Sequence, residues 1–331
     1  MTPIQEVAKR AEVSVATVSR VINNNPYVKP ATRERVLEAI EALNYIPNLS
    51  GRILRCNETK VVLVLLPTIS NPFYSKAVTG IRHIADKFGY LILICNTESS
   101  AQKEMEFLEI LRHKQADGAI VMSQELDIAQ LDKIGAHYPI VQCFEYRKSE
   151  ILSHVAIDNE KAAYEAVNYL IGLGHKRIGL VGCNTQYSSA LQREMGYKRA
   201  MEDAGIPLDP NLIIRGDYGF KSGYNCTGKL MEHKPTAIFA ISDMQAIGVT
   251  KALKGMGLLV PRDISVVGFD NVTFAEIYDP GITTISQPTY KMGSKAMTIL
   301  INQMKGEASA PQHITMKHTL VVRESARPLD A

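Results

Sequence analysis

The sequence predicts an α/β protein with a small three-helix domain followed by a larger core of two similar lobes. Residues 3 to 45 have the apolar spacing of helices, whereas from residue 61 apolar strands alternate with amphipathic helices. The alternation comes as two successive series, which indicates two open sheets of parallel strands. A chain of 331 residues is also long enough for two or three domains.

Two short helices joined by a tight turn are predicted over residues 3 to 22, because the apolar residues of each share one face. Ser14 lies where the second helix needs an N-cap, since its hydroxyl can accept the free amides of the first turn. An ordinary helical hairpin fits this pattern as well. The outward side chains of the second helix are small apart from one arginine, which suits a helix that enters the DNA major groove. They are Val15, Ala16, Thr17, Ser19 and Arg20.

A third helix is predicted from Arg33 to Asn44, with Thr32 as its cap. Its apolar residues at helical spacing are Val36, Leu37, Ile40 and Leu43. Three segments then resemble the DNA-binding headpiece of the LacI family of bacterial repressors. They are residues 13 to 23 (VSVATVSRVIN), 32 to 36 (TRERV) and 43 to 48 (LNYIPN).

The resemblance implies a headpiece that reads operator DNA and a hinge helix whose Leu54 wedges into the minor groove. Arg20 is expected to read guanine, with apolar contacts at Val15 and Ala16. Glu12 departs from the glycine or asparagine usual in the family's turn, so we expect a slightly strained positive φ there. The residues predicted to contact DNA are Ser14, Val15, Ala16, Thr17, Ser19, Arg20, Asn23, Tyr27, Thr32 and Leu54.

Charge and cysteine content set the general class of the protein. Residues 1 to 60 carry nine Lys and Arg against six acids, whereas the other 271 residues carry 28 of each. The excess suits phosphate contacts in the headpiece, although a solvated surface would explain it equally. Five cysteines without a C-x-x-C pair indicate small core residues in a reducing compartment. With no apolar leader and no run of about 18 apolar residues, we expect a soluble, cytoplasmic protein without membrane contact.

The core pattern places each strand and helix in turn. Strands are expected at residues 61–66, 90–95, 118–122, 140–144, 154–157, 178–183, 212–215, 237–241, 265–269 and in the region 313–322. Helices are expected at residues 73–87, 102–113, 128–137, 161–173, 190–204, 222–232, 245–256 and 290–304. In the LacI family the last helix and strand region return to the lobes, so neither lobe is expected to be contiguous.

Polar and aromatic residues follow many of these strands, at the sheet edge where open α/β proteins bind ligands. The mixture suits a hydroxyl-bearing ligand with a flat face. Each acid alone could simply cap a helix. The LacI resemblance places the effector contacts at Phe73, Tyr74, Ser189, Arg193, Tyr218, Asp243 and Asp270.

Arg193 and Asp270 are expected to face each other across the ligand, with the guanidinium as donor on one side and the carboxylate as acceptor on the other. Glu145 stands where many sugar-responsive members of the family have aspartate. We therefore include Glu145 among the effector contacts and favour the nucleoside-responsive branch, with a pentose or hexose as the alternative.

Catalytic motifs are missing from the sequence. It has no P-loop, no G-x-G-x-x-G after the first strand, no H-E-x-x-H and no G-x-S-x-G. No catalytic residue, metal site or cofactor is predicted. A solute-binding protein is the first alternative, but it would lack the headpiece. A sugar or nucleotide enzyme on an open α/β sheet is the second, but it would need a phosphate loop.

We predict a homodimeric transcriptional regulator, most simply a repressor, that binds double-stranded operator DNA and a small effector. Its fold class is α/β, with a helix-turn-helix headpiece, a hinge helix and a two-lobed core like that of periplasmic binding proteins. The expected bounds are 1–47 for the headpiece, 48–60 for the hinge and 61–331 for the core. The N-lobe is expected at about 61–157 and 288–317, and the C-lobe at about 158–287 and 318–331.

Overall fold

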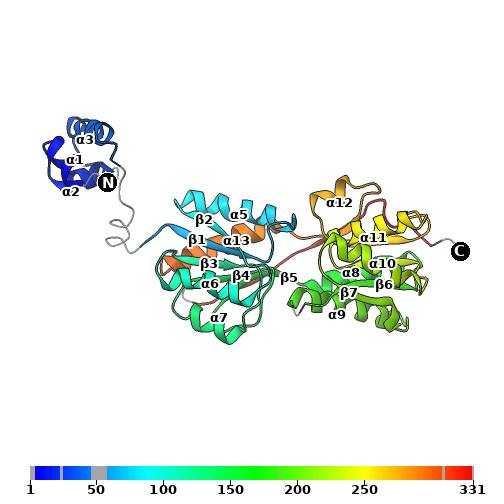
Figure 1. Cartoon of the computed structure of the whole chain (residues 1–331). Coiled ribbons are helices and arrows are strands. Elements are labelled where there is room, and N and C mark those ends of the chain that lie inside the picture. The colour runs from blue at the N-terminus through cyan, green and yellow to red at the C-terminus, as the bar shows by residue number, and fades with distance from the viewer. Residues whose placement is uncertain (1–3, 23–24, 46–57, 186, 308–309, 330–331) are drawn as a thin grey trace. The chain divides into compact units, whose positions relative to one another are not determined.

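The computed structural model describes residues 4–22, 25–45, 58–185, 187–307 and 310–329. The chain divides into two compact units, Met1–Thr59 and Lys60–Ala331 (Figure 1). No helix in the described part of the chain is both long and apolar enough to cross a membrane.

The first unit is a bundle of three helices, α1 (Ile4–Arg10), α2 (Val15–Ile22) and α3 (Pro30–Ala42). Its small core contains the fully buried Val7, Val18 and Val36. The predicted cap of α2 is confirmed, because the Thr17 amide donates to Ser14 Oγ at 3.2 Å. The predicted positive φ at Glu12 is also confirmed, at 54°.

Two predictions about α3 are wrong. The helix begins at Pro30 with Lys29 as N-cap, so Thr32 lies inside its first turn and caps nothing. Proline is favoured at this position because the first helical amide needs no partner and the ring already has a helical φ. Leu37, predicted on the apolar face, is 51% exposed.

The N-lobe of the second unit is a six-stranded sheet in the order β11-β5-β4-β3-β1-β2, with all neighbouring strands parallel. Its strands are β1 (Val61–Leu66), β2 (Leu91–Asn96), β3 (Gly118–Val121), β4 (Ile140–Cys143), β5 (Ser153–Ile157) and β11 (His313–Met316). Its helices are α5 (Phe73–Lys87), α6 (Ala101–Arg112), α7 (Ile128–Gly135) and α13 (Thr289–Met304).

The C-lobe is a second six-stranded sheet in the order β12-β10-β9-β8-β6-β7. Only the β10–β12 pair among the described strands of this sheet is antiparallel. Its strands are β6 (Ile178–Cys183), β7 (Ile213–Gly216), β8 (Ala237–Ala240), β9 (Ser265–Asp270), β10 (Thr283–Ser286) and β12 (Thr319–Val321). Its helices are α8 (Asn159–Gly172), α9 (Ser188–Asp203), α10 (Phe220–Met231), α11 (Asp243–Gly255) and α12 (Thr273–Ile277), with a 3-10 turn at Pro210–Leu212.

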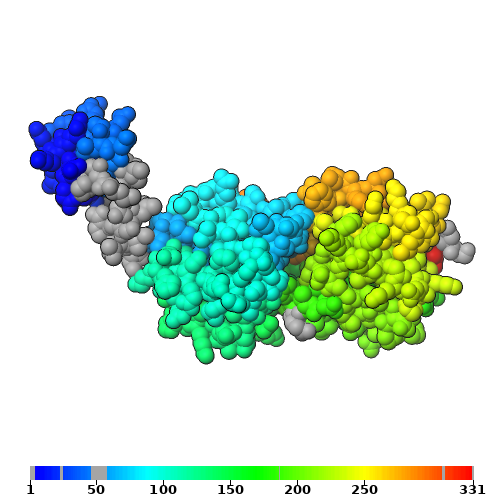
Figure 2. All heavy atoms as spheres, in the orientation of Figure 1, coloured from blue at the N-terminus to red at the C-terminus, as the bar shows by residue number. Residues whose placement is uncertain are grey.

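The chain passes between the lobes three times, after β5, after β10 and between β11 and β12. Figure 2 shows the seam where the cyan N-lobe meets the green and yellow C-lobe. The predicted class, two open sheets of mainly parallel strands flanked by helices, is confirmed. The sequence pattern missed α12 and β10, and the single strand region predicted at 313–322 is two strands in different sheets.

Close helix contacts in the N-lobe depend on glycine. A Cβ on Gly80 of α5 would lie 2.1 Å from the Tyr290 carbonyl oxygen of α13, and one on Gly293 would lie 2.2 Å from the Ala77 carbonyl oxygen. No side chain fits at either position, so α5 and α13 pack backbone to backbone. This contact holds the returning helix against the N-lobe.

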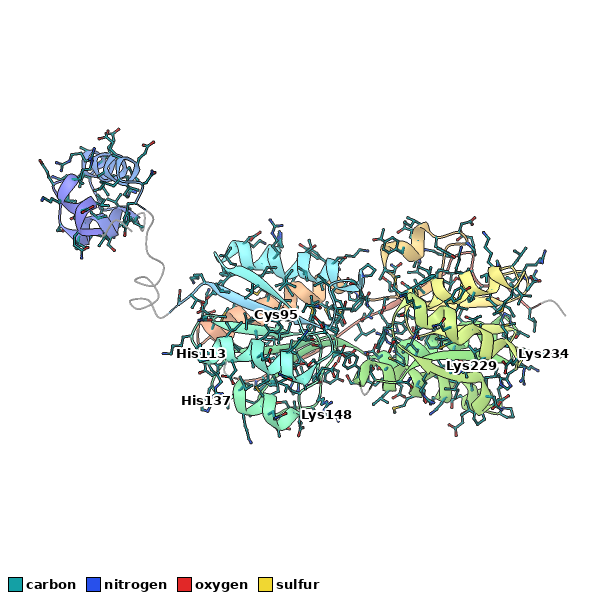
Figure 3. The ribbon with its side chains drawn as sticks, in the orientation of Figure 1. Cys95, His113, His137, Lys148, Lys229 and Lys234 are labelled. Atoms are coloured by element: carbon teal, nitrogen blue, oxygen red, sulfur yellow. The ribbon has the colours of Figure 1, made fainter. Side chains whose placement is uncertain are left out.

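The four described cysteines are free thiols in the core, as predicted. Cys95 lies in the N-lobe sheet (Figure 3) and is 1% exposed. Burial raises its pKa to about 11. These thiols are therefore small apolar core groups rather than reactive nucleophiles.

Candidate functional site

A cavity of about 430 Å³ lies between the two lobes, where the carboxyl ends of several strands of both sheets meet. Its size falls within the range of small-molecule sites. Pro67 and Ser70 follow β1, Phe144 and Glu145 follow β4, and Asp270 ends β9. The cavity therefore lies at the sheet edge that the sequence pattern nominated.

The C-lobe side of the cavity centres on Arg193 of α9, which is 4% exposed. Its Nε donates to Asn159 Oδ1 at 3.0 Å, and its Nη1 donates to the Ile241 carbonyl oxygen at 2.6 Å. Nη1 also lies 3.4 Å from Asp270 Oδ1, and the guanidinium stacks 3.7 Å from the centre of the Phe269 ring. These contacts fix the guanidinium before any ligand arrives.

Asp270 is held beside Arg193 by a second donor, because Gln287 Nε2 donates to its Oδ1 at 2.8 Å. Its backbone φ is 114°, a value that residues other than glycine rarely adopt, which indicates that the surrounding structure constrains this position. Burial raises its pKa to about 6, although the nearby Arg193 charge acts in the opposite direction. Arg193 and Asp270 thus form one pair on one lobe, and the prediction that they oppose each other across a ligand is wrong.

Asp243 does not line the cavity, contrary to its prediction as an effector contact. It is fully buried, and its two oxygens accept from the Val272 amide at 2.8 Å and the Thr284 hydroxyl at 2.6 Å. Burial, and next the Asp270 charge, raise the pKa of Asp243 well above its usual value. Asp243 therefore supports the turn that follows Asp270 from behind.

The N-lobe side of the cavity is aromatic. Phe73 makes edge contacts with Tyr74 and Phe144, with ring centres 5.2 Å and 4.8 Å apart. Tyr187 and Tyr218 face them from the C-lobe, with ring centres 6.3 Å apart. Burial, then the Glu145 charge, raise the pKa of both Tyr74 and Tyr218, so these hydroxyls stay protonated. The walls offer flat apolar surface with neutral hydroxyl groups.

Glu145 lines the same cavity but already has protein partners. Its carboxylate accepts from Ser188 and Ser189 of the C-lobe, and Ser189 Oγ lies 2.8 Å from the Tyr218 hydroxyl. The cavity therefore has two polar regions, the Arg193–Asp270 pair and this hydroxyl chain.

The headpiece has its own exposed groove, formed where α2 meets the loop before α3. Arg20 and Ala16 of α2 are exposed, and Tyr27 of the loop is 93% exposed. Val15 is 37% exposed. Five residues predicted to contact DNA line the groove together: Ser14, Thr17, Arg20, Tyr27 and Thr32. Ser19 is half-buried beside it, whereas Asn23, Leu54 and most of the predicted hinge lie outside the described residues.

Comparison with known proteins identifies the family. Residues 3–48 match the family model described as bacterial regulatory proteins, lacI family, and residues 152–326 match a periplasmic binding protein-like domain. The HTH-type transcriptional repressor CytR of Escherichia coli (strain K12) is 38% identical over 329 residues, which cover 98% of this chain and 96% of CytR. The chain belongs to the lacI family.

Solved structures of transcriptional regulators have a similar architecture. A lac repressor dimer bound to operator and the anti-inducer ONPF matches with a TM-score of 0.88 and 27% identity, over 98% of this chain and 99% of that one. A complex of the transcriptional regulator CelR with cellobiose matches with a TM-score of 0.75 and 30% identity, over 98% and 100%. This lacI-family chain is a DNA-binding transcriptional repressor and not an enzyme.

Two residues on the cavity that bond to the Arg193–Asp270 pair were not predicted from the sequence: Asn159 and Gln287. Asn159 and Gln287 sit where the chain crosses between lobes, just after β5 and β10. Asn159 could have been predicted, because it comes shortly after a strand that was recognised. Gln287 could not, because the strand before it, β10, was not recognised. Within the described residues, no three His, Cys, Asp or Glu side chains gather as a metal site.

Proposed function

We propose that this repressor binds a small, uncharged polar ligand in the interlobe cavity, and that the ligand controls its affinity for operator DNA. The buried Arg193–Asp270 pair carries the proposal, because it sets a fixed donor beside a fixed acceptor on the wall of the interlobe cavity. Neighbouring hydroxyls of a ligand can bond to both at once. Phe73, Tyr74, Ser189 and Tyr218 complete the proposed contacts.

The charge of the cavity argues for an uncharged ligand. Glu145, Asp217 and Asp270 line it together with one cation, Arg193, whose Nε and Nη1 already donate to protein groups. A phosphate would meet more negative than positive charge in a site of low polarity, at a high electrostatic cost. Nucleosides and free sugars should therefore bind better than their phosphates.

A nucleoside is the favoured class, because the aromatic walls suit a flat base and the Arg193–Asp270 pair suits ribose hydroxyls. A free sugar is the alternative, and CelR, whose complex holds cellobiose, favours it. Linkage requires that ligand and operator change each other's affinity by the same factor. The direction of that change, induction or co-repression, follows from the DNA titrations proposed below.

The core also has a surface suited to a second copy of the chain. Apolar side chains are exposed on β2 and on α12, which Figure 1 shows along the same side of the core as α5. Exposed apolar side chains that gather on one side of a protein favour an interaction surface there. We propose a homodimer through this side, acting in the cytoplasm and placing two headpieces on a near-palindromic operator. The residues are Leu91, Leu93, Ile94, Phe274 and Ile277, which are 72%, 46%, 45%, 49% and 68% exposed.

A thermal-shift panel tests the ligand class, since a ligand of the native state adds about RT ln(1 + [L]/Kd) to its stability. Nucleosides, bases, pentoses, hexoses and their phosphates are each added to the intact protein. A nucleoside at 100 times its Kd should add about 2.7 kcal/mol. A response to sugars alone would reject the nucleoside, and a response to phosphates alone would reject the charge argument. The ligand that responds is then used in operator titrations.

The DNA contacts are tested with Arg20→Ala. If Arg20 reads a guanine, this change costs about 1 to 3 kcal/mol of discrimination at one base pair. Arg10→Ala, at the end of α1, is the control, and any loss of affinity that it causes should be equal on specific and random DNA. An equal loss on both DNAs for Arg20→Ala would assign that side chain to the phosphates instead.

The proposed domain bounds are tested by deleting residues 1–60. Because the described core has its own buried clusters, the product should fold, dimerise and bind ligand. Circular dichroism and sedimentation would show an unfolded or monomeric product if the bounds are misplaced.

A further inference from the structure

Contacts between protein groups close one side of the cavity. Glu145, which follows β4 of the N-lobe, accepts three hydrogen bonds from the start of α9 in the C-lobe. Its Oε2 accepts from Ser188 Oγ at 3.2 Å and from the Ser189 amide at 3.1 Å, and its Oε1 accepts from Ser189 Oγ. Both carboxylate oxygens are therefore used by the opposite lobe.

The residue before them extends the same contact. The Tyr187 hydroxyl donates to Glu125 Oε1 of the N-lobe and lies 3.1 Å from Ser99 Oγ. Three consecutive C-lobe residues, 187 to 189, are thus held by N-lobe side chains. We call Tyr187, Ser188 and Ser189 with Glu125 and Glu145 the interlobe clasp.

Helix α9 explains why a carboxylate is needed at this place. Its N-cap residue, Tyr187, makes no side-chain capping bond, and its first turn contains no acidic residue. The first amides of a helix need acceptors, and the partial positive charge at that end favours an anion. The Glu145 carboxylate of the N-lobe supplies both an acceptor and a negative charge, so it caps α9 of the C-lobe.

The bonds between Glu145 and α9 are buried, and they can form only while the two lobes are in contact. Glu145 is 8% exposed and Ser189 is 2% exposed. Among the described residues Glu145 forms no ion pair, so the hydroxyls and the helix end balance its charge. Separating the lobes would leave the first turn of α9 without this acceptor.

We propose that Glu145 is a positioning residue that sets how readily the lobes separate, rather than a contact that recognises the effector. This inference rests on the proposed function, because closure regulates DNA binding only if a ligand occupies the cavity. The Tyr218 hydroxyl lies 2.8 Å from Ser189 Oγ and links the cavity to the clasp. A ligand that bonds to Tyr218 therefore acts directly on the closure contact.

Hydrogen exchange of the ligand-free, full-length protein tests the clasp. Glu145→Gln keeps the shape but replaces one acceptor oxygen with a donor, so the amides of residues 189–192 should exchange at least about tenfold faster. Ser189→Ala removes only the bond that the Ser189 hydroxyl donates to Glu145, so the same amides should show a smaller increase in exchange rate. Glu109→Gln, in an exposed pair with Arg112, is the matched control and should change nothing there.

Two results would overturn the proposal. Unchanged exchange at residues 189–192 in Glu145→Gln would show that the clasp does not hold α9. An equal increase in α10 would show that Glu145 supports the fold of the whole lobe instead of closure. Both measurements are made without ligand, so a thermal-shift panel with no response would refute the proposed function and leave the clasp standing.

Ligand binding gives a separate readout of the positioning role. Adenosine and ribose are the probes, because one carries a base and the other does not. If Glu145 acts through closure, Glu145→Gln changes the affinity of both by a common factor. A loss confined to one probe would make Glu145 a recognition residue and overturn the assignment.

Discussion

The two lobes of the core have the same strand order, yet they bring different chemistry to the cavity. In both sheets the first strand of the lobe lies next to the edge, and a strand from the end of the chain forms the other edge. The N-lobe contributes the rings of Phe73, Tyr74 and Phe144, whereas the C-lobe contributes the fixed pair of Arg193 and Asp270. The same strand order thus places three rings on the N-lobe side of the cavity and a fixed donor–acceptor pair on the C-lobe side.

The lobes also differ in how each stabilises a buried acid near the carboxyl edge of its sheet. Asp270 of the C-lobe has a cation and an amide as partners. Glu104 of the N-lobe accepts from the Glu125 amide at 3.0 Å, but its Oε1 has no partner among the described residues. Burial raises the pKa of Glu104 to about 7 and that of Asp270 to about 6. The carboxylate of Asp270 is therefore better supported than that of Glu104, because Asp270 lies beside a cation.

The largest effect is expected from Arg193→Ala. The change leaves Asn159 Oδ1 and the Ile241 carbonyl oxygen buried without this donor, and it leaves Asp270 buried without its cation. It also removes the contact with Phe269. Breaking a buried pair in this way costs about 3 to 5 kcal/mol. Denaturant unfolding should show this loss, and the thermal-shift response to ligand should disappear.

Arg262→Ala is the control for that prediction, because its pair with Asp263 is exposed to solvent and should contribute little to stability. Similar losses in the two variants would mean that Arg193 is not the centre of a buried network.

The two buried acids predict a difference in pH dependence. Each has a pKa above its unfolded value, so the native state holds a proton that the unfolded chain has already lost. Their contributions to stability are complete near pH 4 and are lost as the pH rises, through about 7 for Glu104 and about 6 for Asp270. The loss is on the order of 3 kcal/mol for Glu104 and less for Asp270.

Unfolding free energies measured from pH 4 to 8 test this difference. Glu104→Gln and Asp270→Asn should each flatten the decline in its own range, and Glu104→Gln should have the larger effect. If Asp270→Asn flattened the curve more, the comparison between the lobes would be reversed.

The sequence predicted β1, β6 and α5 well because β1 and β6 are short, continuously buried runs of mainly apolar residues, whereas α5 buries one face at helical spacing. The bounds of β1, α5 and β6 match those expected from the pattern. Strand β10 (TTIS) was missed because its buried threonines look polar in the sequence. In the fold, the Thr283 hydroxyl donates to the Arg323 carbonyl oxygen and the Thr284 hydroxyl donates to Asp243.

The site was predicted less completely, because residues after a strand can turn either way. Asp243 and Asp270 both come at strand ends, but only Asp270 reaches the cavity. Asp243 turns back to bind the Val272 amide, a contact between residues far apart in sequence. The family resemblance supplied Arg193 and Tyr218, whereas Glu145 has partners that no local pattern could show.

The smallest effect is expected from Phe73→Leu on the aromatic side. Phe73 is 9% exposed and makes edge contacts with two other rings, so leucine keeps apolar volume but loses the flat surface. Ring contacts of this kind contribute about 0.5 to 1.5 kcal/mol, which corresponds to a roughly 2- to 12-fold weaker affinity for a nucleoside. Calorimetric titration measures the change, and Phe107→Leu in α6 of the same lobe is the control. A free sugar has no flat base, so its affinity should change less, and an equal loss for both ligands would show that the N-lobe supplies volume rather than a stacking surface.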